Sequence, residues 1–181
     1  GVHLDALEIF DIAFISDRSG GNNLWVMSAD GRDTVQLSKT TDDMYVSPEW
    51  TPDGKYVAVT RSAQGGAPKI FLYHVDGGAG IQVIREPAPL SAIGATFTPD
   101  GRHMWYATRQ ATWTYNAIFP QYQLAAYDRE LGTATTMTAR YGSAFRPAIS
   151  PDGKWLAYCS RYEEKTGLRL RDLATGNERW L

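Results

Sequence analysis

The fold-deciding stretch reads Thr51-Pro52-Asp53-Gly54-Lys55-Tyr56-Val57-Ala58-Val59, a turn followed at once by an apolar run. The turn recurs as Thr98-Pro99-Asp100-Gly101 and as Ser150-Pro151-Asp152-Gly153, and each copy again leads into an apolar run. Proline presets φ at the first turn position, aspartate bonds its own backbone, and glycine adopts the position with φ > 0. Each copy therefore predicts a tight turn that joins two adjacent antiparallel strands.

The same order of elements follows each turn. A polar loop comes after the apolar run, then a further apolar stretch, a turn with Asp and Gly, and a last short strand. A first copy, residues 12–37, lacks the Pro-Asp-Gly turn but keeps the rest. No window shows sustained helical periodicity. A four-stranded antiparallel meander of about 45 residues is typical of a β-propeller blade. We expect an all-β, single-segment chain, residues 1–181, with four blades near residues 1–38, 45–84, 92–138 and 144–181.

The arrangement of such blades predicts two faces and two open ends. Apolar residues follow one another in the second strands, which indicates burial on both sides against neighbouring blades. The two kinds of turn share one face, and the remaining loops lie on the other face, where propellers usually bind ligands. The first unit has at best a weak inner strand at residues 2–7, and the fourth is complete in its own strands. We therefore expect a partial, open propeller, whose bare faces a longer polypeptide or self-association would cover.

Composition excludes several classes of protein. The chain has 18 basic and 20 acidic residues, which argues against a nucleic-acid partner. No apolar run approaches the roughly 20 residues of a membrane span, and the start of the chain does not resemble a signal peptide. Cys159 is the only cysteine, so no intrachain disulfide is possible, and we expect it to be a buried strand residue.

Catalytic patterns are missing as well. The histidines are His3, His74 and His103, and they form no His-x-His pair. The Gly-x-Ser-x-Gly nucleophile elbow does not occur. We expect no catalytic residue, no metal and no cofactor in this chain.

Two groups of residues are candidates for binding. We expect Arg18, Arg61, Arg109 and Arg161 all to stand just past the end of a second strand, at similar positions around one face. Each could cap carbonyls or pair with a loop aspartate, or together they could form a positive rim for an acidic partner or substrate. The long loop 109–123 contains Trp113, Tyr115 and Phe119. These rings could pack over the blade edge or contact a partner.

The repeat resembles the TolB-like propeller repeat, one of the WD-repeat-like families, and residues 12–37 match it best. Residues 72–78 and 172–179 are similar to the N-terminal propeller of secreted bacterial amidohydrolases. This resemblance implies a non-catalytic accessory module, or part of one, that binds protein or substrate beside a covalently linked hydrolase domain, in the periplasm or outside the cell. The alternative is a TolB-like periplasmic component that acts through protein–protein contact. A third possibility is a propeller enzyme with a histidine-bound metal, such as a polysaccharide lyase.

Overall fold

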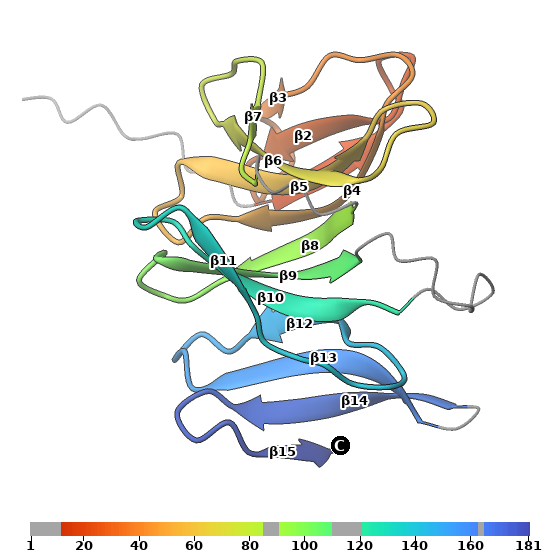
Figure 1. The fold of residues 1–181 in the computed structure, drawn as a ribbon. Coiled ribbons are helices and arrows are strands. Elements are labelled where there is room, and N and C mark those ends of the chain that lie inside the picture. Colours follow the sequence, from red (N-terminus) through yellow and green to blue (C-terminus); the bar gives the residue numbers. More distant parts are fainter. Residues whose placement is uncertain (1–11, 85–90, 110–120, 163–164) are drawn as a thin grey trace, which may run out of the picture.

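The computed structural model describes residues 12–84, 91–109, 121–162 and 165–181, and these form antiparallel sheets joined by turns and loops (Figure 1). The first sheet contains β1 (Ile12–Ser16), β2 (Asn23–Met27) and β3 (Thr34–Gln36). The second contains β4 (Met44–Trp50), β5 (Tyr56–Ser62), β6 (Lys69–His74) and β7 (Ile81–Gln82). The third contains β8 (Ser91–Phe97), β9 (His103–Arg109), β10 (Gln123–Asp128) and β11 (Thr133–Thr136). The fourth contains β12 (Phe145–Ile149), β13 (Trp155–Tyr162), β14 (Lys165–Asp172) and β15 (Glu178–Trp180).

Every sheet is a simple meander in which sequential strands pair antiparallel. The all-β fold with four-stranded propeller blades is confirmed for the second, third and fourth sheets. The first sheet has three strands among the described residues, and the inner strand expected at residues 2–7 lies outside them. The described residues contain no helix.

The Pro-Asp-Gly turns join the first and second strands of a sheet, as the repeat predicts. Thr51 Oγ1 donates to Asp53 Oδ1 at 2.6 Å, and the same carboxylate oxygen accepts the backbone N–H of Lys55 at 3.1 Å. Gly54 has φ 68°, a conformation that glycine adopts without a steric penalty. The same contacts recur at residues 98–102 and 150–154. The Ser or Thr before each proline is thus part of the turn, because its hydroxyl holds the aspartate.

In Figure 1 the third sheet lies below the first and second sheets, and the fourth sheet lies below the third. The inner strand β8 contacts both β4 and β12, and β1 contacts β4. Alternate residues of one strand enter different interfaces: Val57 and Val59 of β5 pack toward the first sheet, and Ala58 packs toward the third. The three interfaces hold three buried clusters, represented by Leu24, Val57 and Tyr73, by Ile70, Met104 and Tyr106, and by Leu124, Leu156 and Tyr158.

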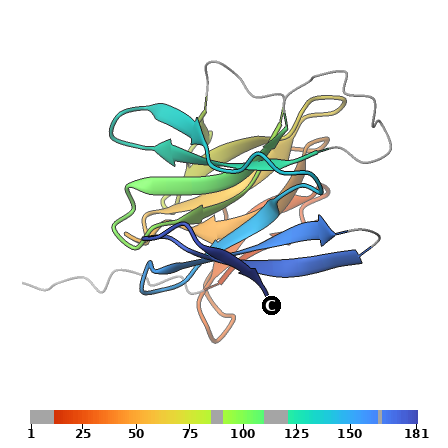
Figure 2. The same ribbon diagram turned by 60° about the horizontal axis from the view of Figure 1, so that its bottom comes forward.

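The fourth sheet leaves one broad face uncovered by any other described sheet. Register pairs Cys159 with Leu168, on the side opposite to the buried Leu156 and Tyr158. The exposed fractions are 39% for Trp155 and 48% for Leu168 on this face. Figure 2 turns the fourth sheet toward the viewer, with the other sheets behind it. Cys159 is a strand residue of β13, as expected, but it is half-buried and not buried, because no described sheet covers this side.

The inner strands of the last three sheets share one irregularity. Each has a β-bulge, and the residue at its start has positive φ: Ser47 at 55°, Gly94 at 62° and Arg146 at 53°. Serine and arginine rarely adopt this conformation, which costs an L-residue roughly 1–2 kcal/mol. The bulge therefore recurs at the same place in these three sheets whether or not a glycine is present.

Candidate functional site

The four predicted arginines lie at the same end of equivalent strands. Arg18 lies just past the end of β1, as expected. The expectation is wrong for the other three, because these strands run further than the apolar run: Arg109 is the last residue of β9, and Arg61 and Arg161 are the second-last residues of β5 and β13. We call this end of the sheets the loop face, because β1, β5, β9 and β13 end there and the described loops after β1 and β5 lie there. The opposite end, with the Pro-Asp-Gly turns, is the turn face (Figure 1).

Arg61 is held by a carboxylate of the loop before β4 and by an aromatic ring of its own sheet. Its Nε donates to Asp43 Oδ2 at 2.5 Å, and its guanidinium lies 4.9 Å from the centroid of the Phe71 ring. Partial burial is the largest single effect and lowers the pKa of Arg61, but the hydrogen bond to Asp43 and the charges of Tyr73, Tyr45 and Asp43 together raise this pKa above its ordinary value. The side chains of Arg61 and Asp43 are 26% and 12% exposed. For Arg61 this geometry is the pairing with a loop aspartate, so its charge is already neutralised by a neighbour.

Arg18 and Arg161 lie against aromatic rings. The Arg18 guanidinium is 5.0 Å from the centroid of Phe14 and 5.1 Å from that of Trp25, and its Nε donates to Ser16 Oγ at 3.1 Å. Arg161 lies 5.6 Å from the centroid of Phe145. Stacking fixes the direction of these guanidinium groups and leaves Arg18 exposed.

The other candidates are placed less fully. Arg109 is exposed and pairs in register with Ser91. Trp113, Tyr115 and Phe119 lie outside the described residues, so their predicted place on the loop face stays a prediction.

His74 and His103 belong to different sheets and have different carboxylate neighbours. His74 Nδ1 lies 3.3 Å from Asp76 Oδ2, and His103 Nε2 lies 3.6 Å from Asp128 Oδ2. Among the described residues, no group of three or more His, Cys, Asp and Glu side chains is arranged to hold a metal ion.

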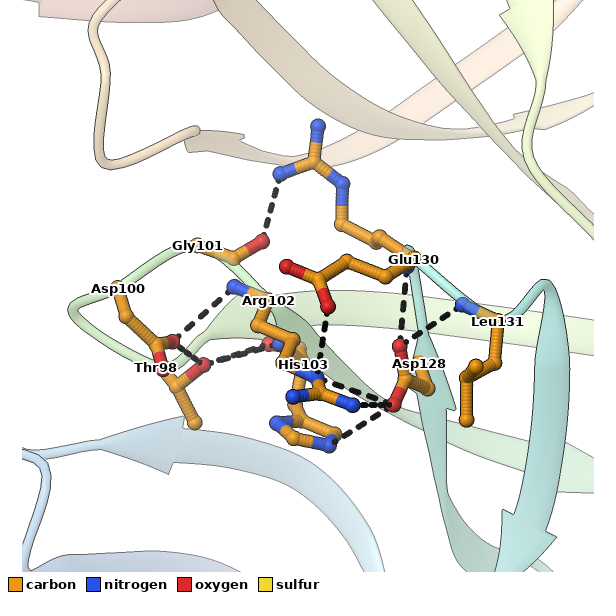
Figure 3. A network of polar contacts seen from close by, with 9 residues as sticks. Thr98, Asp100, Gly101, Arg102, His103, Asp128, Glu130 and Leu131 are labelled. Carbon is orange, nitrogen blue, oxygen red and sulfur yellow. Dashed lines mark hydrogen bonds and ion pairs between the residues drawn. The ribbon is translucent and has the colours of Figure 1, made fainter.

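Asp100 and Asp128 on the turn face of the third sheet accept hydrogen bonds from residues of the turns at this face, as Figure 3 shows. Asp128 accepts hydrogen bonds from Arg102 Nη2 at 2.8 Å and from the backbone N–H groups of Glu130 and Leu131 at 2.9 and 3.1 Å. These bonds, led by that of Arg102, lower the pKa of Asp128 to about 2. Such a carboxylate stays ionised and is poorly suited to act as a general acid or base near neutral pH.

A second basic cluster lies between the third and fourth sheets. Arg140, in the loop before β12, and Arg169 and Arg171, on β14, surround the carboxylate of Glu178 on β15. The sequence signal was the alternation of Leu and Arg at residues 168–171, because a period of two places both arginines on one side of a strand. Sequence reasoning treated this stretch only as a strand, since Arg140 and Glu178 join the cluster through tertiary folding.

No helix among the described residues is long and apolar enough to cross a membrane.

Comparison with known proteins gives relatives of two kinds. The chain is 30% identical over 156 residues to the uncharacterized peptidase YuxL of Bacillus subtilis, and the matched region is 84% of this chain and 20% of YuxL. It is 26% identical over 149 residues to a TolB homologue of Chlorobium chlorochromatii, and the matched region is 82% of this chain and 31% of the relative. The chain therefore spans a third or less of these relatives.

The fold has a direct counterpart among solved structures. The crystal structure of TolB from Acinetobacter baumannii matches 93% of this chain and 40% of its own, with a TM-score of 0.73 and 21% identity. No protein-family model matches the chain. The meander sheets, the Pro-Asp-Gly turns and this structural match lead to one conclusion: the chain has a TolB-like β-propeller fold, and its described residues form four sheets of such a propeller.

Proposed function

We propose that this chain is a non-catalytic propeller module that binds protein or substrate through its loop face. The finer form of the proposal is an accessory N-terminal domain, or part of one, of an exported amidohydrolase-type hydrolase that carries a linked catalytic domain. Its place would then be the periplasm or the outside of the cell.

The observation that carries the proposal is the pairing of arginine with aromatic rings on the loop face. Arg18 lies over Phe14 and Trp25, and Arg161 lies over Phe145. Arginine and aromatic side chains are enriched in protein interfaces and often dominate their binding energy. A guanidinium already held by a ring loses less conformational freedom when a partner binds.

The open face of the fourth sheet supports a modular role. Trp155, Leu168 and Leu181 are 39%, 48% and 63% exposed on the last sheet or at its edge. Apolar surface of this kind is normally covered by a neighbour in a soluble protein. A further blade, a linked domain or a second copy of the chain would each supply such cover.

The alternative is a TolB-like component that acts through protein–protein contact, which the resemblance to TolB proteins favours. The gene sequence after the codon for Leu181 separates the two. A metal-dependent hydrolase domain with a His-x-His pair supports the accessory role, whereas further propeller repeats and a stop codon support the TolB-like role.

Binding through the loop face is tested with exposed arginines at opposite ends of the sheets. The hydrolase domain, if the reading frame encodes one, is expressed separately, and its affinity for the 181-residue chain is measured by calorimetry. We expect Arg18→Glu and Arg109→Glu to weaken binding about tenfold or more, the loss of one good charged contact. The control is Arg32→Glu, because the Arg32 side chain is 82% exposed on the turn face. Equal losses in all three variants would contradict a loop-face site.

A further inference from the structure

The basic cluster between the third and fourth sheets contains more positive charge than its neighbours neutralise. Glu178 faces three guanidinium groups: Arg171 Nη1 lies 3.2 Å from Oε1, Arg169 Nη1 lies 3.8 Å from Oε2, and Arg140 Nη2 pairs with Oε2. Three arginines against one glutamate leave an excess of two positive charges. The side chains are only 24%, 20% and 20% exposed for Arg140, Arg169 and Arg171, so water screens this excess incompletely.

Aromatic rings and one carbonyl hold the guanidinium groups in place. Arg169 lies 4.2 Å from the centroid of the Trp180 ring, and Arg140 lies 5.6 Å from that of Tyr158. Arg171 Nη1 also donates to the carbonyl oxygen of Met137 at 3.3 Å. An arginine has five N–H donors, so the donors of the cluster outnumber the two oxygens of Glu178. The Nε atoms of Arg140 and Arg169 are buried and have no hydrogen-bond partner among the described residues.

A pocket opens directly onto this cluster. It has a volume of about 350 Å³, near the lower end of the roughly 300–1,000 Å³ of small-molecule sites. It is lined by residues 137–140, by residues 176–178 and by Arg171. Arg140 and Arg171 thus contribute their charge to the lining, and Asn177 adds a side chain with donor and acceptor groups.

We propose that this pocket binds a small oxyanion, namely a molecule that carries a phosphate group or more than one carboxylate. The planar fork of a guanidinium matches carboxylate and phosphate oxygens and forms short, charge-assisted hydrogen bonds with them. A ligand with two negative charges would balance the excess charge of the cluster. The site is separate from the arginines of the loop face, because it is built from β14, β15 and the loop before β12.

Calorimetric titration of the purified 181-residue chain with inorganic phosphate and, separately, with citrate tests the proposal at low ionic strength. We expect saturable binding of at least one anion with one site per chain, and the tighter of the two identifies the preferred chemistry. Saturable binding of neither anion overturns the proposal. Binding of a triglutamate peptide in the absence of phosphate and citrate binding also overturns it, because the site would then serve an acidic protein segment.

Three variants place the binding in the pocket. Arg171→Gln should weaken the affinity about tenfold or more, through the loss of a charge-assisted hydrogen bond. Glu178→Gln should strengthen it, because a competing carboxylate is removed. Arg32→Gln removes one positive charge far from the pocket, in the turn with Asp30, and should change nothing. Equal weakening by Arg171→Gln and Arg32→Gln, or weakening by Glu178→Gln, would overturn the assignment. Urea midpoints near that of the wild type exclude loss of folding as the cause.

Discussion

Two leucines of the fourth sheet test whether its outer face is open. Leu156 on β13 is fully buried against the third sheet, in the cluster that contains Leu124 and Tyr158. Leu168 on β14 lies on the opposite side of the same sheet and is 48% exposed. Both sit in regular strand pairs, so Leu156→Ala and Leu168→Ala differ mainly in what covers the side chain.

The expected costs follow from this burial. Removal of a fully buried leucine side chain destabilises a protein by about 2–5 kcal/mol, because it loses transfer energy and leaves a cavity. Complete burial of a leucine contributes about 1.5–3 kcal/mol, so the half-exposed Leu168 should cost about 1 kcal/mol. Leu131→Ala, at a side chain that is 69% exposed, is the control and should change the free energy of unfolding by less than about 0.5 kcal/mol.

Urea unfolding, followed by tryptophan fluorescence at several protein concentrations, measures these differences. If copies associate through the outer face, the cost of Leu168→Ala will rise with concentration, because association stabilises the folded state. Cys159 pairs in register with Leu168, so its rate of labelling by a thiol reagent should fall at the same concentrations. A monomer in which Leu168→Ala costs as much as Leu156→Ala would refute the open face.

Three further predictions concern single side chains. Gly94→Ala should lower the free energy of unfolding by about 1–2 kcal/mol, because Gly94 has φ 62°, a conformation that is unfavourable for an L-residue. An added Cβ would meet no atom within 4 Å, so the loss comes from the backbone alone. An unchanged midpoint of urea unfolding would contradict this. Asn23→Ala should lower the free energy of unfolding by about 2–3 kcal/mol, because the buried Asn23 amide donates to the carbonyl of Thr40 at 3.0 Å and accepts from Ser38 Oγ at 2.9 Å. A change within about 0.5 kcal/mol, the effect of a surface substitution, would show that the segment with Ser38 and Thr40 keeps its place without the Asn23 side chain. Asp128 has its pKa lowered from 3.8 to about 2, first by Arg102, so its stabilising effect is present above pH 3.8 and is lost as the pH falls through 2. Asp128→Asn should therefore be less stable than the wild type at pH 6, and the difference should close well below the folded-state pKa of about 2, where the carboxyl group is protonated in both states. A difference that keeps its full size there would contradict the role of the ionised form.

The sequence predicted the features of the blade that depend on short segments. The Pro-Asp-Gly turns lie where their chemistry places them, because the hydrogen bonds of a tight turn join residues two to five positions apart. Burial on both sides of the second strands was predicted for the same reason, since consecutive apolar residues point to opposite faces. Val57 and Ala58 indeed enter different clusters.

Features that depend on distant segments were not predicted. The bulge positions are occupied by Ser47, Gly94 and Arg146, and no local rule assigns positive φ to three such different residues. The hydrogen bonds of Asn23 at the start of β2 were not predicted, because its partners Ser38 and Thr40 lie 15 and 17 residues away in the sequence. Gln123, the first residue of β10, makes the equivalent contacts with Thr138 and Arg140. The repeat therefore did contain a sequence signal for this contact, namely a polar amide at the first position of the equivalent strands β2 and β10.

The loop face shows why a repeat predicts the place of an arginine better than whether its charge is paired. Arg61 and Arg18 occupy similar positions, yet Arg61 is neutralised by Asp43, whereas Arg18 stacks on two rings and has no ion pair among the described residues. The difference comes from Asp43, which belongs to the loop between two blades and not to the repeated strands. Such loops can change without disturbing the blade core, because their side chains do not enter the three buried clusters to the same extent as the strands do. Any selectivity of the loop face should therefore follow the residues of these loops, and replacement of Asp43 by Asn should make Arg61 available to an acidic partner.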